Sequence, residues 1–384
     1  MDIFSNFGFW GGGWTGWILP FLFGLTIVVF FHELGHFLIA RWCGVRVLTF
    51  SVGFGPEIVG FNDRYGTRWK LSWIPLGGYV KFFGDDNEAS VPDAATIANM
   101  TGAERRQSFF HQPVGRRAAI VAAGPIANFI LAIVIFSAIL IFHGRQTGTA
   151  FVESVQPDSA AAAAGMQPGD IVVAIDGQPV ESFVDIKQIV SANAGRALIF
   201  QINRGGTPLS LTATPTFTRG KDGFGNKTCG GLLGISGPTI KNPTTEHVDP
   251  MTAVWLGAKQ TWSIIDRTFV FIGGLFAGRE CADQLGGPIR IAQISGQVAT
   301  LGFMPVLHLA AMLSVSIGLL NLFPVPLLDG GHLLFYAIEA ARGRPLSMRA
   351  QEIGFRIGFA LVVMLMIFTV FNDTIQLLPR LWAS

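Results

Sequence analysis

Two histidines and a glutamate lie within five residues near the start of the chain, in the order His32, Glu33, Leu34, Gly35, His36. Helix positions four apart share one face, so His32 and His36 can present their imidazoles to one metal ion. Zinc accepts such nitrogens, and a catalytic zinc site keeps one position open for water. Glu33 is then placed to take a proton from that water as it attacks a carbonyl group. These residues at this spacing predict zinc-dependent hydrolysis.

The setting of the motif distinguishes it from a chance match. The motif ends a strongly apolar run at residues 17–31, and titratable groups inside a membrane span are costly and usually functional. The alternative is a pair of packed helix histidines beside a carboxylate, but a glutamate is rarely buried without a partner. We therefore interpret His32 and His36 as metal ligands and Glu33 as the group that moves the proton.

The composition is that of an integral membrane protein. Of the 384 residues, 50% are hydrophobic and 14% are charged, whereas soluble domains are roughly 25% charged. The small net charge of +2 argues against nucleic acid as a partner. The first residues lack the lysine or arginine that opens a cleavable signal peptide, so the first apolar segment is expected to remain in the protein.

The three cysteines are too few for a disulfide framework. Cys43 lies beside the first apolar segment. Cys229 and Cys281 can pair if both face an oxidising compartment, and the sequence leaves that question open. All three are expected to be structural, because none has the neighbours of a metal site.

Four segments are long and apolar enough to cross about 30 Å of hydrocarbon. They are predicted at residues 17–40, 118–142, 305–322 and 355–371. Arginines gather between the first and second spans and between the third and fourth, which places both connections in the cytosol. Both ends of the chain and the segment between the second and third spans are then expected on the opposite side.

Residues 45–83 do not have a helical pattern. They form short β-rich runs broken by glycine and proline, yet they are too apolar for an ordinary loop. Sheet structure at membrane depth survives only where it is buried in protein or lines a wet cavity. We predict a re-entrant β element whose free edge can pair with an extended peptide. The alternative is a structural hairpin that covers the metal site.

Residues 148–235 alternate β runs with a helical segment near residues 183–191, as a soluble α/β domain does. The stretches AGMQPGDI at residues 164–171 and AIDGQPV at 174–180 resemble a PDZ domain of the bacterial envelope type. PDZ domains bind peptides by strand addition. Peptide binding and a size filter over the membrane site are both open as roles of this domain.

Asp329 supplies a candidate for the third metal ligand. It follows Pro324 and Pro326, which break the third span, and it lies in an apolar run where a carboxylate needs a partner. Two histidines and a carboxylate are a known catalytic zinc set. Asn128, a polar residue in the second span, is interpreted as an interhelical contact rather than a catalyst.

Residues 251–278 are apolar, but Lys259, Asp266 and Arg267 lie in their middle, which is expensive for a lone helix in lipid. The helical spacing of the apolar positions favours an amphipathic helix at the membrane interface. Chain parity supports this interpretation. If residues 251–278 crossed the membrane, Asp329 would emerge on the side opposite to His32 and His36.

Together these motifs resemble the site-2 protease family of intramembrane zinc metalloproteases, and most closely its bacterial regulator-of-sigma-E protease branch. The resemblance covers essentially the whole chain. It rests on HELGH at residues 32–36, PLGGYVK at 75–81, AAGPIANF at 122–129, the PDZ pattern, and NLFPVPLLDGGH at 321–332. The resemblance implies Zn²⁺ held by His32, His36 and Asp329, with Glu33 as the catalytic acid and base.

The resemblance also implies a set of substrate-binding residues. They are Asn321, Pro324 and Pro326 in the segment before Asp329, and Gly77, Gly78 and Tyr79 in the β element. Residues 251–278 fall where the family has a membrane-hugging helix. His332 lies outside the family's ligand set and is expected to be structural. The best-known member carries two PDZ domains, whereas this chain has room for one, which puts a two-domain filter in doubt here.

The expected fold is a polytopic α-helical membrane protein with four transmembrane helices, a re-entrant membrane β element and an inserted α/β PDZ domain. We divide the chain into an N-terminal membrane core (residues 1–147), the PDZ domain (148–235), an interfacial helix region (236–300) and a C-terminal membrane core (301–384). By resemblance the chain belongs in the bacterial inner membrane, with both termini and the PDZ domain periplasmic and the active site near the cytosolic side.

The expected activity is hydrolysis of peptide bonds within transmembrane segments of single-span proteins, in regulated intramembrane proteolysis. The resemblance implies anti-sigma factors and remnant signal peptides as substrates. The bilayer and a peptide ligand of the PDZ domain are the other expected partners. One alternative is a non-catalytic PDZ-bearing scaffold, which would function without zinc. A metal transporter is the other alternative, but it needs charged residues along a path that the second and fourth spans do not offer.

Overall fold

The structure is a computed structural model that describes residues 15–85, 99–147, 150–221, 227–237, 244–278, 281 and 285–381. The chain forms two compact units. The first unit draws on residues 1–136, 256–261 and 287–384, and the second on residues 137–255 and 262–286. Two long helices, α4 (Val114–His143) and α7 (Pro250–Phe276), contribute residues to both units.

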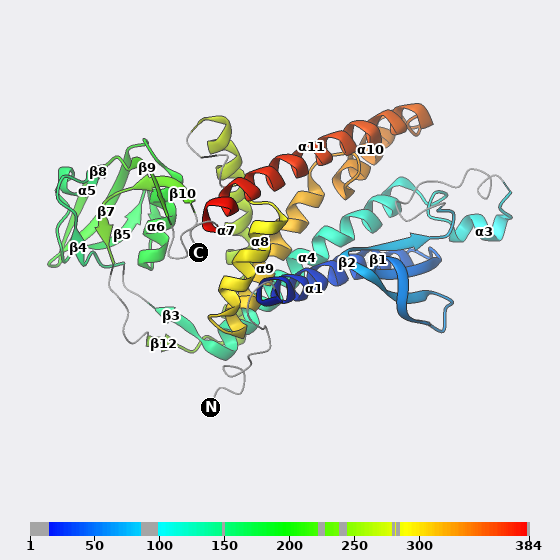
Figure 1. Cartoon of the computed structure of the whole chain (residues 1–384), viewed down its shortest axis with the longest axis horizontal. Coiled ribbons are helices and arrows are strands. Elements are labelled where there is room, and N and C mark those ends of the chain that lie inside the picture. The colour runs from blue at the N-terminus through cyan, green and yellow to red at the C-terminus, as the bar shows by residue number, and fades with distance from the viewer. Residues whose placement is uncertain are drawn as a thin grey trace. The chain divides into compact units, whose positions relative to one another are not determined.

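The first unit is helical with one β-hairpin (Figure 1). Besides part of α4, its helices are α1 (Thr15–Trp42), α3 (Gly102–Gln107), α8 (Pro288–Ala299), α9 (Phe303–Leu322), α10 (Asp329–Arg342) and α11 (Met348–Leu381). Its strands β1 (Val47–Asn62) and β2 (Arg68–Phe82) pair antiparallel.

Four helices in the described part of the chain are long and apolar enough to cross a membrane. They are Gly16–Trp42, Val114–His143, Phe303–Leu322 and Arg349–Gln376. Each contains one of the four spans predicted from the sequence, and all four reach the roughly 20 residues that a crossing needs. They fit the predicted polytopic α-helical membrane protein. The α7 helix is not among the four found within the described residues.

The β1–β2 hairpin lies beside α1 (Figure 1). Its inner face is aromatic: Phe50 stacks on Trp69 with ring centroids 4.3 Å apart, and Phe50 meets Phe37 of α1 edge to face at 5.6 Å. Towards the hairpin turn, large apolar side chains such as Val59 and Trp73 are exposed instead. The β structure predicted at residues 45–83 is therefore present, with one part packed on α1 and another part free of protein contacts.

The second unit contains the predicted α/β domain. Its central sheet has four antiparallel strands in the order β6 (Gln178–Pro179), β5 (Ile171–Ile175), β7 (Leu198–Arg204), β8 (Thr207–Ala213). The helices α5 (Ala160–Ala163) and α6 (Phe183–Ala192) accompany this sheet. The remaining strands are β3 (Arg145–Thr147), β4 (Ser154–Val155), β9 (Thr216–Lys221), β10 (Lys227–Leu232), β11 (Ile235–Ser236) and β12 (Thr244–Glu246).

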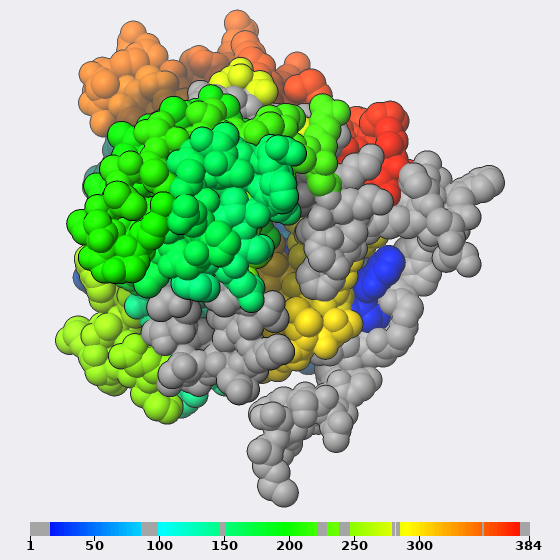
Figure 2. All heavy atoms as spheres, turned by 90° about the vertical axis from the view of Figure 1, so that its left-hand side faces the viewer, coloured from blue at the N-terminus to red at the C-terminus, as the bar shows by residue number. Residues whose placement is uncertain are grey.

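The core of this domain forms between the sheet and α6. Phe200, Ile186 and Ile175 are fully buried there, because inward-facing residues alternate along β7 and β5. Ser182 caps α6 by accepting a hydrogen bond from the Asp185 amide, and the Asp185 carboxylate returns one to the Ser182 amide. In Figure 2 the green residues of this domain form one continuous rounded surface.

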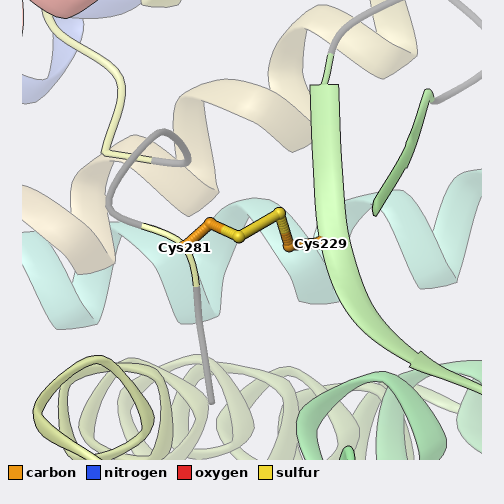
Figure 3. Close-up of a disulfide and its surroundings, with 2 residues drawn as sticks. All are labelled: Cys229 and Cys281. Carbon is orange, nitrogen blue, oxygen red and sulfur yellow. A yellow bond between two sulfur atoms is a disulfide. The ribbon is translucent and has the colours of Figure 1, made fainter. Parts of the chain in front are cut away.

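A disulfide joins Cys229 of β10 to Cys281, with Cα atoms 6.0 Å apart (Figure 3). The sequence left this pairing open, and the structure decides it. The bridge closes a chain segment of 52 residues that includes all of α7. Cys43 remains a free cysteine.

Candidate metal centre

The α1 and α10 helices bring three metal-ligating side chains together. The Oδ2 atom of Asp329 lies 3.1 Å from Nε2 of His32 and 3.5 Å from Nε2 of His36. The two Nε2 atoms lie 3.3 Å apart. The structure therefore brings together the two histidines of the first span and the aspartate that follows the third, as the sequence predicts.

These separations fit a tetrahedral zinc ion. Zinc binds histidine nitrogen and carboxylate oxygen at about 2.0–2.2 Å, so two ligand atoms at tetrahedral positions lie about 3.4 Å apart. The Oδ2 atom of Asp329 is also buried and accepts no hydrogen bond of acceptable geometry from the described residues. A buried carboxylate oxygen without a hydrogen bond is costly unless a cation binds it. The donor set and the orphaned oxygen thus both fit Zn²⁺.

The backbone that delivers Asp329 is tightly constrained. Leu327 adopts φ +127°, a region that a leucine enters only when its surroundings enforce it. A Cβ atom added to Gly330 would lie 2.2 Å from the carbonyl oxygen of Phe323, and one added to Gly331 would lie 2.4 Å from the carbonyl oxygen of Val325. Only glycine fits at both positions, so the two glycines after Asp329 let α10 begin directly against the proline-broken segment.

The α4 helix holds both histidines from behind. Nδ1 of His36 lies 2.9 Å from the backbone carbonyl oxygen of Ile120, and Nδ1 of His32 lies 3.2 Å from Nδ2 of Asn128. The sequence-based interpretation of Asn128 as an interhelical contact is therefore incomplete. Its amide does join two helices, but its partner is a predicted metal ligand. Two residues of the same helix thus contact the nitrogens that face away from the metal position.

Close approach of α1 and α4 depends on glycine. A Cβ atom at Gly124 would lie 2.3 Å from Nε2 of His36 and 2.9 Å from Cε1 of His32. A Cβ atom at Gly35 would lie 2.3 Å from the carbonyl oxygen of Ala123. Small residues at such positions allow helix backbones to approach closely in membranes. The glycine of HELGH and the glycine of AAGPIANF therefore make room for the metal centre.

A cavity of about 990 Å³ opens beside the cluster. The predicted residues that line it are His32, Glu33, His36, Asp329, Asn321, Gly77, Gly78 and Tyr79. The structure does not place Pro324 or Pro326 in the lining. Pro324 is exposed, and the backbone of Pro326 packs against Gly358 of α11. The two leucines between Pro326 and Asp329 line the cavity instead.

The cavity also has a polar end that sequence reasoning missed. Arg117 of α4 forms an ion pair with Glu339 of α10, with Nη2 and Oε1 2.6 Å apart and both side chains largely buried. The Arg117 guanidinium also lies over the ring of Tyr336, 4.9 Å from its centroid. The sequence offered only the arginine cluster at the start of the second span, which we used for membrane orientation. His332 lines the same cavity, and burial lowers its pKa.

Glu33 and Asp329 differ in their surroundings. Glu33 is 9% exposed, lines the cavity and makes no hydrogen bond or ion pair with any described residue. Burial acts to raise the pKa of Asp329, but the neighbouring imidazoles outweigh burial and hold that pKa below its ordinary value. Asp329 is thus suited to be an anionic ligand, whereas Glu33 has a carboxylate free for a proton.

Two imidazoles, a carboxylate and an adjacent glutamate, on helices of which one is long enough to span a membrane, define a membrane zinc metalloprotease. The chain belongs to Peptidase family M50, whose sequence pattern matches residues 20–365. This match confirms the predicted family, the zinc cofactor and the peptidase activity class. It also excludes the scaffold and transporter alternatives.

Curated relatives have the same character along their full lengths. "Putative zinc metalloprotease Atu1380" of Agrobacterium fabrum is 52% identical, covering 95% of this chain and 97% of the relative. "Metalloprotease MmpA" of Caulobacter vibrioides is 38% identical, covering 93% and 94%. "Regulator of sigma-E protease RseP" of Escherichia coli is 33% identical, covering 93% and 98%. The family, the bacterial relatives and the four long apolar helices indicate an inner-membrane protein.

Among solved structures, the PDZ domain of an SdrC-like protein from Listeria monocytogenes matches 24% of this chain and 90% of that chain. Its sequence identity is 21% and its TM-score is 0.19. A TM-score this low carries no argument about the fold of the domain.

Proposed function

We propose that this metalloprotease hydrolyses peptide bonds within the membrane-spanning segments of single-span proteins, at a zinc ion held by His32, His36 and Asp329. The observation that carries the proposal is the convergence of three ligand atoms at tetrahedral spacing next to Glu33. Two of these ligands lie on α1, which is long enough to span a membrane. A site at that depth meets a substrate's spanning segment directly.

Glu33 is the proton carrier in this mechanism. Zinc at such a site lowers the pKa of a coordinated water towards about 7 and polarises a carbonyl group. Glu33 takes the proton from the attacking water and later gives it to the leaving amine, which balances the hydrolysis. Its carboxylate is buried in the cavity wall and makes no bond to the described residues. That leaves both oxygens available for water and for the amine.

The β2 strand is proposed to hold the substrate in an extended form. A helix hides its carbonyls in its own hydrogen bonds, so it must unwind before it is cut. Gly78 and Tyr79 of β2 line the cavity, and a Cβ atom at Gly78 would lie 2.9 Å from Cγ of Glu33. The sheet has only two strands, so the outer edge of β2 pairs with no other strand. Strand addition at that edge would carry a substrate past Glu33, with Asn321 of α9 across the cavity.

The proposed topology places the α/β domain and both termini in the periplasm. The Cys229–Cys281 disulfide supports this orientation, because disulfides persist in oxidising compartments such as the periplasm. Arg117 and its neighbours, and the arginines around Arg342, would then lie on the cytosolic side. The exposed apolar side chains near the β1–β2 turn, such as Val59 and Trp73, support contact of this hairpin with the bilayer.

The name of the Escherichia coli relative connects that protein with regulation of sigma-E. We include anti-sigma factors and remnant signal peptides as the proposed substrate class, within regulated intramembrane proteolysis. The α/β domain is proposed to act at the periplasmic surface, either by binding a peptide or by limiting the size of substrates. Residue roles at the substrate site, including those of Gly77 and Asn321, are part of the same proposal.

The experiment uses the detergent-solubilised full chain and a model single-span substrate, with and without a zinc chelator. We expect cleavage within the spanning segment, loss of cleavage with the chelator, and recovery after zinc is added back. Glu33→Gln should lower kcat about 10²–10⁴-fold while zinc content stays at the wild-type level. Glu153→Gln, which changes an exposed acid of the α/β domain, is the matched control. Cleavage by Glu33→Gln at the wild-type rate would refute the mechanism.

A further inference from the structure

The protons on the two histidines follow from which nitrogen faces the metal position. In both residues Nε2 points into the cluster with Asp329. A neutral imidazole that binds a metal through Nε2 must carry its proton on Nδ1. For His36 this requirement is met, because the carbonyl oxygen of Ile120, 2.9 Å from Nδ1, can only accept a hydrogen bond. The backbone of α4 therefore fixes the tautomer of His36.

His32 needs an acceptor at the corresponding place, and its neighbour is the side-chain amide of Asn128. An amide can donate through nitrogen or accept through oxygen, and the two orientations differ by a half-turn. With Nδ2 placed 3.2 Å from Nδ1 of His32, the Oδ1 atom of Asn128 is buried without a hydrogen-bond partner among the described residues. A half-turn of the amide brings that orphaned oxygen to the Nδ1 proton of His32.

We propose that Asn128 is a positioning residue for the metal centre: its amide oxygen accepts the Nδ1 proton of His32 and so directs the Nε2 lone pair at zinc. The inference rests on the proposed metal site. It adds a residue from the AAGPIANF stretch that serves neither as ligand nor as proton carrier. Asn128 itself is fully buried, and its position is fixed by Ser314 of α9, which donates to its backbone carbonyl at 2.8 Å.

The geometry of α4 explains why an asparagine occupies this position. Ile120, Gly124 and Asn128 are spaced four residues apart, so they share one face of the helix. That face gives His36 a backbone acceptor, leaves room for both rings at Gly124, and gives His32 a side-chain acceptor. A backbone carbonyl cannot serve His32 in the same way at a helical position whose carbonyl oxygen is engaged elsewhere, as that of Asn128 is with Ser314.

The test compares four full-length proteins in detergent: wild type, Asn128→Leu, Asn128→Asp and Ser314→Ala. Leucine has a similar size but offers no acceptor, whereas aspartate keeps an acceptor oxygen. Ser314→Ala removes a hydrogen bond to the same residue without changing its amide. Zinc affinity is measured by competition with a chelator, and the visible spectrum of the cobalt-substituted protein reports the geometry of the ligands. Thermal unfolding of the metal-free proteins reports folding separately.

Asn128→Leu should weaken zinc binding about 10- to 100-fold and change the cobalt spectrum. Asn128→Asp should bind zinc at least as tightly as wild type. Ser314→Ala should be less stable but keep the wild-type affinity and spectrum. Equal affinities for wild type and Asn128→Leu would overturn the proposal, and so would an equal loss in Asn128→Asp. A His32→Ala protein that keeps its zinc would instead refute the metal site itself.

Discussion

Two buried aspartates in different units of the molecule show opposite chemistry. Asp170, in the α/β domain, has a side chain that is 1% exposed, and it is fully bonded. Arg204 donates to both of its oxygens at 2.7 and 2.9 Å, and the Gln167 amide adds a third hydrogen bond at 2.9 Å. Asp329 lies 3.1 and 3.5 Å from two imidazoles, yet its Oδ2 atom accepts no hydrogen bond of acceptable geometry from the described residues.

The difference teaches how to recognise a functional carboxylate in this protein. Burying a charge is expensive, and folds normally offset that cost with partners. Glu339 has Arg117 as its partner, and Asp373 of α11 accepts two backbone amides at the start of α8. Asp329 and Glu33 are buried carboxylates that lack such closure among the described residues. Their missing partners are supplied by zinc, water and substrate in the proposed mechanism.

Replacing the two aspartates separately gives the largest expected contrast. Asp329→Asn should abolish zinc binding and proteolysis, because it removes a metal ligand. It should not destabilise the metal-free protein, because no described residue depends on that oxygen for a hydrogen bond. Zinc content, substrate cleavage and chelator-treated thermal unfolding measure the three quantities. A variant that lost stability but kept its zinc would reverse our distinction between the two sites.

The disulfide predicts a large effect that is confined to stability. Breaking the Cys229–Cys281 bond, by Cys229→Ser with Cys281→Ser, releases a closed segment of 52 residues. The chain-entropy relation for a segment of this length gives about 4 kcal/mol of lost stability. Hydrogen exchange in β9 and β10 should increase, while zinc affinity should stay at the wild-type value. Cys43→Ser, which removes the free cysteine, is the control. Reduced zinc affinity in the double variant would show that the two regions are coupled.

The sequence predicted the metal ligands and the spanning helices because both have strong signals. HELGH fixes two ligands by helical spacing, and long apolar runs fix the helices. It could not reveal Asn128 as a neighbour of His32, because a polar residue in a span indicates a partner without identifying it. The Arg117–Glu339 pair joins residues 222 positions apart, and no local pattern connects them. The cysteine pairing depended on spatial proximity, which composition does not encode.

Crowding at Gly124 tests whether the open site also has exact limits of space. Gly124→Ala places a methyl group 2.3 Å from Nε2 of His36, so that ring must move away from the metal position. Zinc affinity should fall about 10²-fold, as when the residues that orient a ligand are changed. Gly115→Ala, on the same helix but with open space around its Cβ position, should leave zinc affinity unchanged. Equal behaviour of the two variants would contradict the proposed packing.

The closed carboxylate gives the smallest effect and the one that depends on pH. Burial acts to raise the pKa of Asp170, but hydrogen bonds from Arg204 and from the Gln167 amide outweigh it, so the pKa of the folded protein lies below its ordinary value. The stabilisation is therefore complete above the ordinary aspartate pKa of about 3.9 and disappears as the pH falls through the lowered value.

Asp170→Asn should accordingly cost about 1.5–3 kcal/mol of domain stability at pH 7, the range for hydrogen bonds to a charged group. The difference from wild type should shrink as the pH falls below about 4, because both proteins then carry an uncharged side chain. Hydrogen exchange of the β5 and β7 amides, compared at equal pH, measures it, with zinc affinity as the companion reading. A difference that persisted unchanged at the lowest pH would mean that shape rather than charge holds Asp170 in place.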